Sequence, residues 1–133
     1  MIVLNRSLDR AAALAKELGC DHGPLAFPQM RTKEMAADEL RPDVLINATS
    51  VGMHPRHGES PVPREMLKKG MTVMDIVYHP LETTLLREAK EQGCRTIDGL
   101  GMLAHQGAAQ LELWTGKRPD VGQIKEALRK AIL

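Results

Sequence analysis

The chain has 133 residues, with 18 lysines and arginines against 17 aspartates and glutamates, and this length suits a single domain. A formal net charge of +1 excludes the strongly basic surface that nucleic-acid binding usually requires. No apolar run approaches the roughly 18 residues of a membrane-spanning helix, and the first ten residues lack the long apolar stretch of a signal peptide. We therefore expect a globular cytoplasmic protein that binds neither nucleic acid nor a membrane.

Short apolar runs alternate with segments of helical spacing along the chain. The runs cover residues 2–4, 44–46, 73–77 and 95–97, and each is typical of a strand buried on both faces of a parallel sheet. Helices are expected over residues 8–18, 33–40, 63–69 and 81–92, and a glycine follows the first and the last of them. Strands that alternate with helices in this way predict an α/β fold.

Two more helices are expected after the last strand. Residues 100–114 are apolar nearly all round, which predicts a largely buried helix. The final segment is typical of an amphipathic helix packed on the edge of a domain. Its apolar stripe consists of Val121, Ile124, Leu128 and Ile132.

The cysteines and histidines indicate neither a disulfide framework nor a metal site. Cys20 and Cys94 each follow a glycine at the end of a helical segment, and we expect both to be buried as small apolar side chains. The polar segment 54–61 is expected to be an exposed loop. It carries His54 and His57 three residues apart, but no third ligand is near them in the sequence, so no metal is expected there.

The turn after the first strand carries residues suited to an anion. In dinucleotide-binding α/β folds, a carboxylate at a strand tip binds the ribose of NAD, whereas arginine accommodates the 2′-phosphate of NADP. Here the tip reads Asn5-Arg6-Ser7, followed by Arg10, and it has no carboxylate. Ser7 also stands where a helix N-cap is expected. Taken alone, the same residues favour a capped helix with two solvated arginines over an anion site.

Three later segments also combine small and polar residues at the ends of expected strands. Residues 47–53 form a small, hydroxyl-rich turn, which would let a ligand approach the backbone. Residues 75–80 end a strand with Tyr78, either beside a ligand or at the rim of the core. Residues 98–106 open the apolar helix, on which Gln106 needs a polar partner that could be a backbone group or a polyhydroxylated ligand.

Taken together, these segments make the chain similar to the shikimate dehydrogenase family. Four motifs carry the resemblance to its C-terminal NADP-binding part: Asn-Arg-Ser at 5–7 with Arg10, Ile-Asn-Ala-Thr-Ser-Val-Gly-Met at 46–53, Asp-Ile-Val-Tyr at 75–78, and Asp-Gly-Leu-Gly-Met-Leu-Ala-His-Gln at 98–106. The last motif is the most specific. The similarity runs over essentially all 133 residues.

The resemblance implies hydride transfer between NADPH and 3-dehydroshikimate, which gives shikimate in aromatic amino-acid biosynthesis. It assigns no metal. The expected cofactor-binding residues are Asn5, Arg6, Ser7 and Arg10 at the 2′-phosphate and adenine, Thr49, Ser50 and Val51 at the middle of the cofactor, and Ile76, Gly99 and Met102 at the nicotinamide. Tyr78 and Gln106 are expected to bind the substrate.

The resemblance also shows what residues 1–133 do not contain. Family members begin with a substrate-binding domain that carries a catalytic lysine and aspartate, followed by a first strand and a glycine-rich turn for the pyrophosphate. We therefore expect residues 1–133 to form a partial NADP-binding domain, with a truncated Rossmann-like parallel sheet flanked by helices and no catalytic residue. Such a chain should be inactive alone, and it should form a homodimer or associate with the missing domain.

Two other functions are compatible with parts of the sequence. The chain could be a stand-alone nucleotide-binding or interaction module without catalysis, although such a module has no use for Tyr78 and Gln106. It could also derive from another NADP enzyme with a similar arginine loop, such as a glutamyl-tRNA reductase. The segment 98–106 argues against that origin.

Overall fold

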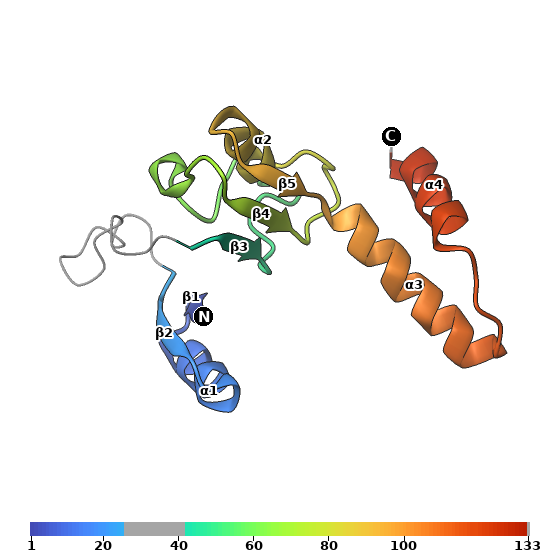
Figure 1. The fold of residues 1–133 in the computed structure, drawn as a ribbon, viewed down its shortest axis with the longest axis horizontal. Coiled ribbons are helices and arrows are strands. Elements are labelled where there is room, and N and C mark those ends of the chain that lie inside the picture. The colour runs from blue at the N-terminus through green and yellow to red at the C-terminus, as the bar shows by residue number, and fades with distance from the viewer. Residues whose placement is uncertain (26–41, 133) are drawn as a thin grey trace. The chain divides into compact units, whose positions relative to one another are not determined.

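The computed structural model describes residues 1–25 and 42–132, which fall into two compact units divided between Arg41 and Pro42. The first unit contains one two-stranded sheet and the second a three-stranded sheet, and both sheets are parallel (Figure 1). The helix expected over residues 33–40 lies outside the described residues. The alternation of strands and helices confirms the predicted α/β fold.

The first unit consists of β1 (Ile2–Asn5), α1 (Leu8–Leu18) and β2 (Asp21–Pro24). Helix α1 packs on both strands through its small side chains, because Ala11 and Ala15 are buried. Gly19 ends the helix in the left-handed conformation, at a φ of 62° that glycine adopts without strain. Both β1 and α1 were predicted from the sequence.

Strand β2 was not predicted, because its sequence carries no strand signal. It reads Asp-His-Gly-Pro, and three of its four residues are exposed. Its conformation comes from backbone pairing with β1, with Ile2 opposite Asp21 and Asn5 opposite Pro24. The backbone N–H of Leu25 continues this pairing by donating to the carbonyl oxygen of Asn5 at 2.9 Å.

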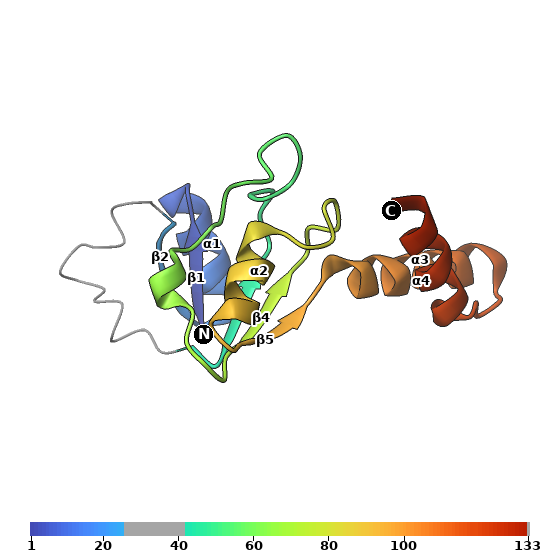
Figure 2. The same ribbon diagram turned by 90° about the horizontal axis from the view of Figure 1, so that it is seen from above.

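The second unit is built on the sheet β3-β4-β5, formed by Val44–Asn47, Thr72–Asp75 and Arg95–Ile97. Helix α2 (Thr84–Glu91) packs on β4 and β5 (Figure 2). Val73 and Leu85 are completely buried in the core between this helix and the sheet. The three strands agree with the apolar runs in the sequence.

Strand β4 ends two residues earlier than the predicted segment 73–77. The carboxylate of Asp75 accepts a hydrogen bond from the backbone N–H of Val77 at 3.0 Å, which directs that N–H away from strand pairing. The helix expected over residues 81–92 begins only at Thr84, because the side chain of Thr83 caps it. The helix expected over 63–69 is wrong: only a 3-10 turn, Arg64–Met66, forms, and Leu67 then becomes extended.

Helices α3 (Gly99–Thr115) and α4 (Val121–Ile132) follow β5 and pack against each other. The prediction that residues 100–114 are largely buried is wrong within the described chain. Only Leu100, Ala104 and Ala108 of these residues are buried, and they form one stripe of the helix at four-residue spacing. Leu113 and Trp114 are 84% and 76% exposed. The described residues supply a packing partner for only one side of this apolar helix.

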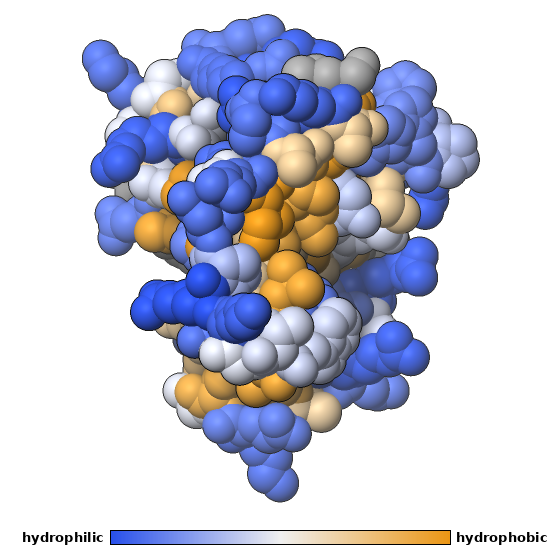
Figure 3. Space-filling view, turned by 90° about the vertical axis from the view of Figure 1, so that its right-hand side faces the viewer, coloured by the Kyte–Doolittle hydropathy of each residue, from blue (hydrophilic) through white to orange (hydrophobic). Residues whose placement is uncertain are grey.

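The surface of the described residues is mixed, and apolar side chains reach it between hydrophilic ones (Figure 3). Residues 54–59 are exposed, as expected for the polar loop. Cys20 and Cys94 are free and only half-buried, which corrects the expectation of full burial. Each stands directly after a helix-ending turn, where the chain runs along the surface. No helix of residues 1–25 and 42–132 is both long and apolar enough to cross a membrane.

Candidate functional site

The turn between β1 and α1 leaves both arginines free to meet a ligand. Asn5 shapes the turn, since its Oδ1 accepts a hydrogen bond from the backbone N–H of Ser7 at 2.9 Å. Ser7 occupies the N-cap position of α1, as predicted, but its hydroxyl makes no capping bond. Arg6, Ser7 and Arg10 are all exposed. Two guanidinium groups and one free hydroxyl therefore lie together at the N-terminal end of a helix, an arrangement suited to a phosphate.

The turn after β3 is organised by Asn47, which is only 3% exposed. Its Oδ1 accepts hydrogen bonds from the backbone N–H of Thr49 at 3.0 Å and from the Thr49 hydroxyl at 2.7 Å. Its Nδ2 donates to the backbone oxygen of Val51 at 3.2 Å. The Thr49 hydroxyl thus donates its proton to Asn47, and its oxygen accepts from the N–H of Val51. Ser50 is the exposed hydroxyl of this turn.

A buried carboxylate connects this turn to the next strand. Asn47 and Asp75 are paired at the ends of β3 and β4, and Asn47 Nδ2 donates to Asp75 Oδ1 at 2.9 Å. Thr83, which caps α2, donates its hydroxyl proton to Asp75 Oδ2 at 2.7 Å. Burial is the largest influence on the Asp75 carboxyl and raises its pKa, while the hydrogen bonds from Thr83, Val77 and Asn47 act against that rise.

Sequence reasoning assigned no role to Asn47, Asp75 or Thr83. Asn47 and Asp75 occur in the motifs 46–53 and 75–78, and each directly follows apolar residues of a strand. Their position could have indicated a contact between them, because parallel strands end at a common edge where polar side chains can meet. Thr83 carries no comparable signal in the sequence, since its partner lies eight residues away across a loop.

We expect the stability difference between the unsubstituted chain and Asp75→Asn to change with pH. A raised pKa means that the Asp75 carboxyl contributes fully to stability below its usual 3.8, and that this contribution is lost as the pH rises through the folded pKa. Asparagine does not ionise, so the relative stability of the variant should be greater at about pH 7 than at about pH 4. Urea unfolding of both proteins at each pH measures the difference in their free energies of unfolding. The exposed Glu65→Gln serves as a control, and an unchanged difference for Asp75→Asn would contradict the assignment.

The segment after β4 lies directly against the first turn of α3. A side-chain carbon added to Gly99 would stand 2.7 Å from the carbonyl carbon of Ile76 and from the carbonyl oxygen of Val77, so only glycine fits. Asp98 caps the helix by accepting from the backbone N–H of Leu100 at 3.1 Å. The start of the motif at 98–106 therefore lies against the segment that follows β4.

The predicted substrate residues both reach solvent. Tyr78 is 40% exposed, one residue beyond the Val77 N–H that Asp75 holds. Gln106 is exposed on α3, so its amide is accessible to solvent and does not require a protein partner. Met102 is half-buried and stands four residues before Gln106, on the same side of the helix.

The predicted site residues thus form two groups, one in each unit. The first group surrounds the β1–α1 turn and contains Asn5, Arg6, Ser7 and Arg10. The second group gathers where β3 and β4 end and α3 begins. It contains Thr49, Ser50, Val51, Ile76, Tyr78 and Gly99, with Met102 and Gln106 farther along α3.

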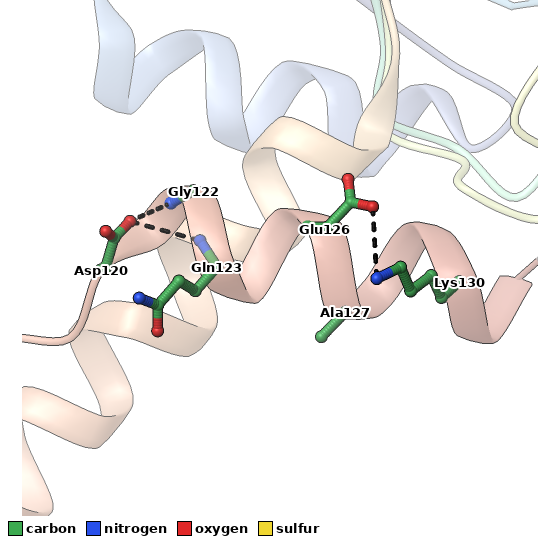
Figure 4. A pocket seen from close by; sticks show the side chains of 6 residues that line it. All are labelled: Asp120, Gly122, Gln123, Glu126, Ala127 and Lys130. Atoms are coloured by element: carbon green, nitrogen blue, oxygen red, sulfur yellow. Dashed lines mark hydrogen bonds and ion pairs between the residues drawn. The ribbon is translucent and has the colours of Figure 1, made fainter.

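A hollow on α4 is not a candidate site. It is lined by residues of this helix and its cap alone, namely Asp120, Gly122, Gln123, Glu126, Ala127 and Lys130 (Figure 4). Asp120 accepts from the N–H groups of Gly122 and Gln123, which caps the helix. Glu126 pairs with Lys130 at 3.6 Å, one turn apart. Helix capping and pairing account for the charged groups around this hollow.

The histidines lie closer together than the sequence suggested. The ring of His54 is 4.7 Å from that of His57 and 4.8 Å from that of His79, measured between ring centres. The fold therefore brings a third imidazole, which is distant in the sequence, near the pair. Within residues 1–25 and 42–132, no three histidine, cysteine or acidic side chains are arranged to hold a metal ion.

Comparison with known proteins places this arrangement among Rossmann-like α/β folds. The shikimate 5-dehydrogenase of Thermus thermophilus, solved with NADP(H) and shikimate, superimposes with a TM-score of 0.81 at 42% identity, over 98% of this chain and 45% of that one. The quinate dehydrogenase of Corynebacterium glutamicum, solved with NAD, gives a TM-score of 0.79 at 31% identity, over 97% and 45% of the two chains.

Sequence comparisons relate the chain to shikimate dehydrogenases. Residues 99–129 match the model of the shikimate 5′-dehydrogenase C-terminal domain. The NADP(+) shikimate dehydrogenase of Methanocaldococcus jannaschii is 40% identical over 129 residues, which are 96% of this chain and 46% of that protein. The Methanocaldococcus jannaschii and Thermus thermophilus homologues are shikimate dehydrogenases, and the chain corresponds to their C-terminal part. It spans about half the length of the curated relatives that it matches.

Proposed function

We propose that this chain is the cofactor-binding part of an NADP-dependent shikimate dehydrogenase, which reduces 3-dehydroshikimate to shikimate. The observation that carries the proposal is the β1–α1 turn. Asn5 fixes this turn, and Arg6 and Arg10 stand exposed beside the free hydroxyl of Ser7. Guanidinium groups bind phosphate oxygens in pairs of hydrogen bonds, which suits the 2′-phosphate that distinguishes NADP from NAD.

The second group of residues supplies the rest of the proposed site. The turn 49–51 would contact the middle of the cofactor, with Ser50 as its exposed hydroxyl. Ile76, Gly99 and Met102 would border the nicotinamide, where the absence of a side chain on Gly99 lets α3 lie against the strand end. The hydroxyl of Tyr78 and the amide of Gln106, both exposed, would bind the hydroxyl and carbonyl groups of the substrate.

The proposal includes a partner for the chain. Within the described residues, β1 pairs only with β2 and β3 pairs only with β4, so each sheet has a strand with one unpaired edge. Val44 and Ile46 of β3 are also 55% and 57% exposed. Unpaired edges with apolar side chains tend to pair with another chain. We propose a homodimer or a complex with the substrate-binding domain of the enzyme, and a cytoplasmic location for either.

The preference between NADP(H) and NAD(H) tests the cofactor assignment. A hydrogen bond to a charged group contributes about 1.5 to 3 kcal/mol, so loss of the Arg6 guanidinium should weaken NADP(H) binding about tenfold or more. Binding of NAD(H) should hardly change, because it has no 2′-phosphate. Isothermal titration calorimetry on Arg6→Ala measures both affinities.

Lys16→Ala is the matched control for this experiment. Lys16 is an exposed cation on the same helix, in its last turn, away from the phosphate turn. The Lys16→Ala variant should bind NADP(H) and NAD(H) as tightly as the unsubstituted chain. An Arg6→Ala variant that still discriminates between the two cofactors as the unsubstituted chain does would refute the assignment of this turn.

A further inference from the structure

Asp75 makes no contact in the proposed site, yet it connects three segments of the second unit. Its Oδ1 accepts hydrogen bonds from Asn47 Nδ2 at 2.9 Å and from the backbone N–H of Val77 at 3.0 Å. Its Oδ2 accepts from the hydroxyl of Thr83 at 2.7 Å. Because its exposed fraction is 0%, a ligand cannot touch it directly. Any effect of Asp75 on binding must therefore pass through its three partners.

The first partner leads to the proposed cofactor turn. Asn47 uses its Nδ2 on Asp75 and Val51 and its Oδ1 on Thr49, so its amide can hold only one orientation. The Asp75 carboxylate, which can only accept, fixes which end of that amide is the donor. The backbone N–H groups of Thr49 and Val51 are then directed inward, and the turn keeps one shape.

The second partner leads to the proposed substrate residue. The N–H of Val77 is held by Asp75, and Tyr78 is the next residue along the chain. The N–H of Ile76 donates to the backbone oxygen of Asn47 at 3.1 Å, which ties the same segment to β3. The third partner, Thr83, attaches the carboxylate to the N-terminus of α2 and is itself fully buried.

We propose that Asp75 is a positioning residue, which sets the spacing between the turn 49–51 and residues 76–78 and so couples the shape of both segments to cofactor binding. Thr83 fixes the carboxylate for this task. The proposal rests on the proposed function, because the two segments matter together only if both contact ligands. Asp75 takes no part in the chemistry and contacts neither ligand.

Amide hydrogen exchange in the ligand-free chain tests the positioning part. In Asp75→Ala, the N–H groups of Thr49, Val51 and Val77 should exchange about tenfold faster or more. The N–H of Val77 loses its acceptor, and Asn47, on which the turn 49–51 depends, loses the bond that orients its amide. The amides of α4 should not change. If the three amides of a folded Asp75→Ala protein exchange as slowly as those of the unsubstituted chain, the proposal is overturned.

Calorimetry with NADP(H) tests the coupling to the ligand. Asp75→Ala should weaken binding about tenfold, while the preference for NADP(H) over NAD(H) stays intact because Arg6 belongs to the other unit. Thr83→Val removes one of the three bonds and should act in the same direction with a smaller effect. Thr83→Ser, which restores the hydroxyl, should recover the original affinity.

These measurements separate the failure of the two proposals. If the unsubstituted chain binds no NADP(H), the proposed function is wrong, and the exchange data still decide whether Asp75 positions the two segments. If NADP(H) binds and folded Asp75→Ala binds it equally well, the coupling is wrong and the proposed function stands. If Asp75→Ala does not fold, Thr83→Val and Thr83→Ser supply the same comparison, and equal affinities of the two would overturn the coupling.

Discussion

The 133-residue polypeptide should show no NADPH oxidation with 3-dehydroshikimate by itself, and it should gain activity when the N-terminal part of a related enzyme is added. Transfer of a hydride to a carbonyl leaves an alkoxide that needs a proton, and positioned acids contribute about 100-fold to 10,000-fold to such steps. The resemblance assigns the lysine and aspartate for this role to the preceding domain. A rise of about 100-fold or more is therefore expected on mixing.

Absorbance of NADPH measures this reaction, with the N-terminal part of the Thermus thermophilus enzyme as the added domain. A mixture without 3-dehydroshikimate gives the background rate. Tyr78→Phe in the same mixture should raise the KM for the substrate, because the exposed hydroxyl is lost while the ring remains. A rate for the polypeptide alone that exceeds the background and equals that of the mixture would mean that an acid within the chain itself protonates the product.

Replacement of Gly99 should cause the largest loss of stability in the chain. A valine side chain here would collide with the carbonyl groups of Ile76 and Val77, which belong to the backbone and cannot rotate away. Overpacking costs about 1 to 3 kcal/mol where side chains can adjust, and we expect a cost at or above about 3 kcal/mol at Gly99. Urea unfolding followed by circular dichroism measures it.

Gly107→Ala is the matched control, because Gly107 lies on the same helix and an added side-chain carbon would meet no atom within 4 Å apart from its chain neighbours and the backbone of its own helix. Alanine favours helix over glycine by about 1 kcal/mol, so this variant should be slightly more stable than the unsubstituted chain. The two glycines should therefore respond in opposite directions. A Gly99→Val protein as stable as Gly107→Ala would show that α3 does not rest on the end of β4.

The sequence predicted those strands that are made of apolar residues. The runs around Val3, Leu45, Val73 and Thr96 became β1, β3, β4 and β5, because burial and backbone pairing agree there. Strand β2 was missed because pairing with β1 alone determines its conformation. The helix expected over 63–69 failed for a related reason: the pattern near Pro63 suits a helix start, but Leu67 turns back toward the core, where it is 2% exposed.

The motifs predicted which segments at the strand ends carry the candidate residues, but not the hydrogen bonds that hold these segments together. They placed Arg6, Thr49 and Tyr78 at strand ends, and in the structure these residues follow the last residues of β1, β3 and β4 at Asn5, Asn47 and Asp75. They did not reveal the bonds behind them, because hydrogen bonds between Asn47, Asp75 and Thr83 depend on strand register and on the position of α2. The periodicity of apolar residues predicts neither the strand register nor the position of α2.

The three buried bonds of Asp75 also limit how this chain can change over generations. No buried side-chain nitrogen or oxygen of the described residues lacks a hydrogen-bond partner. Loss of the Thr83 hydroxyl would leave Asp75 Oδ2 without a partner, at a cost of about 1 to 3 kcal/mol. Loss of the Asp75 carboxylate or of the Asn47 amide would do the same to the backbone N–H of Val77 or of Thr49. A typical domain is stable by only about 5 to 15 kcal/mol. Descendants should therefore keep all three residues or exchange them as a set, so that these positions are inherited together across related sequences.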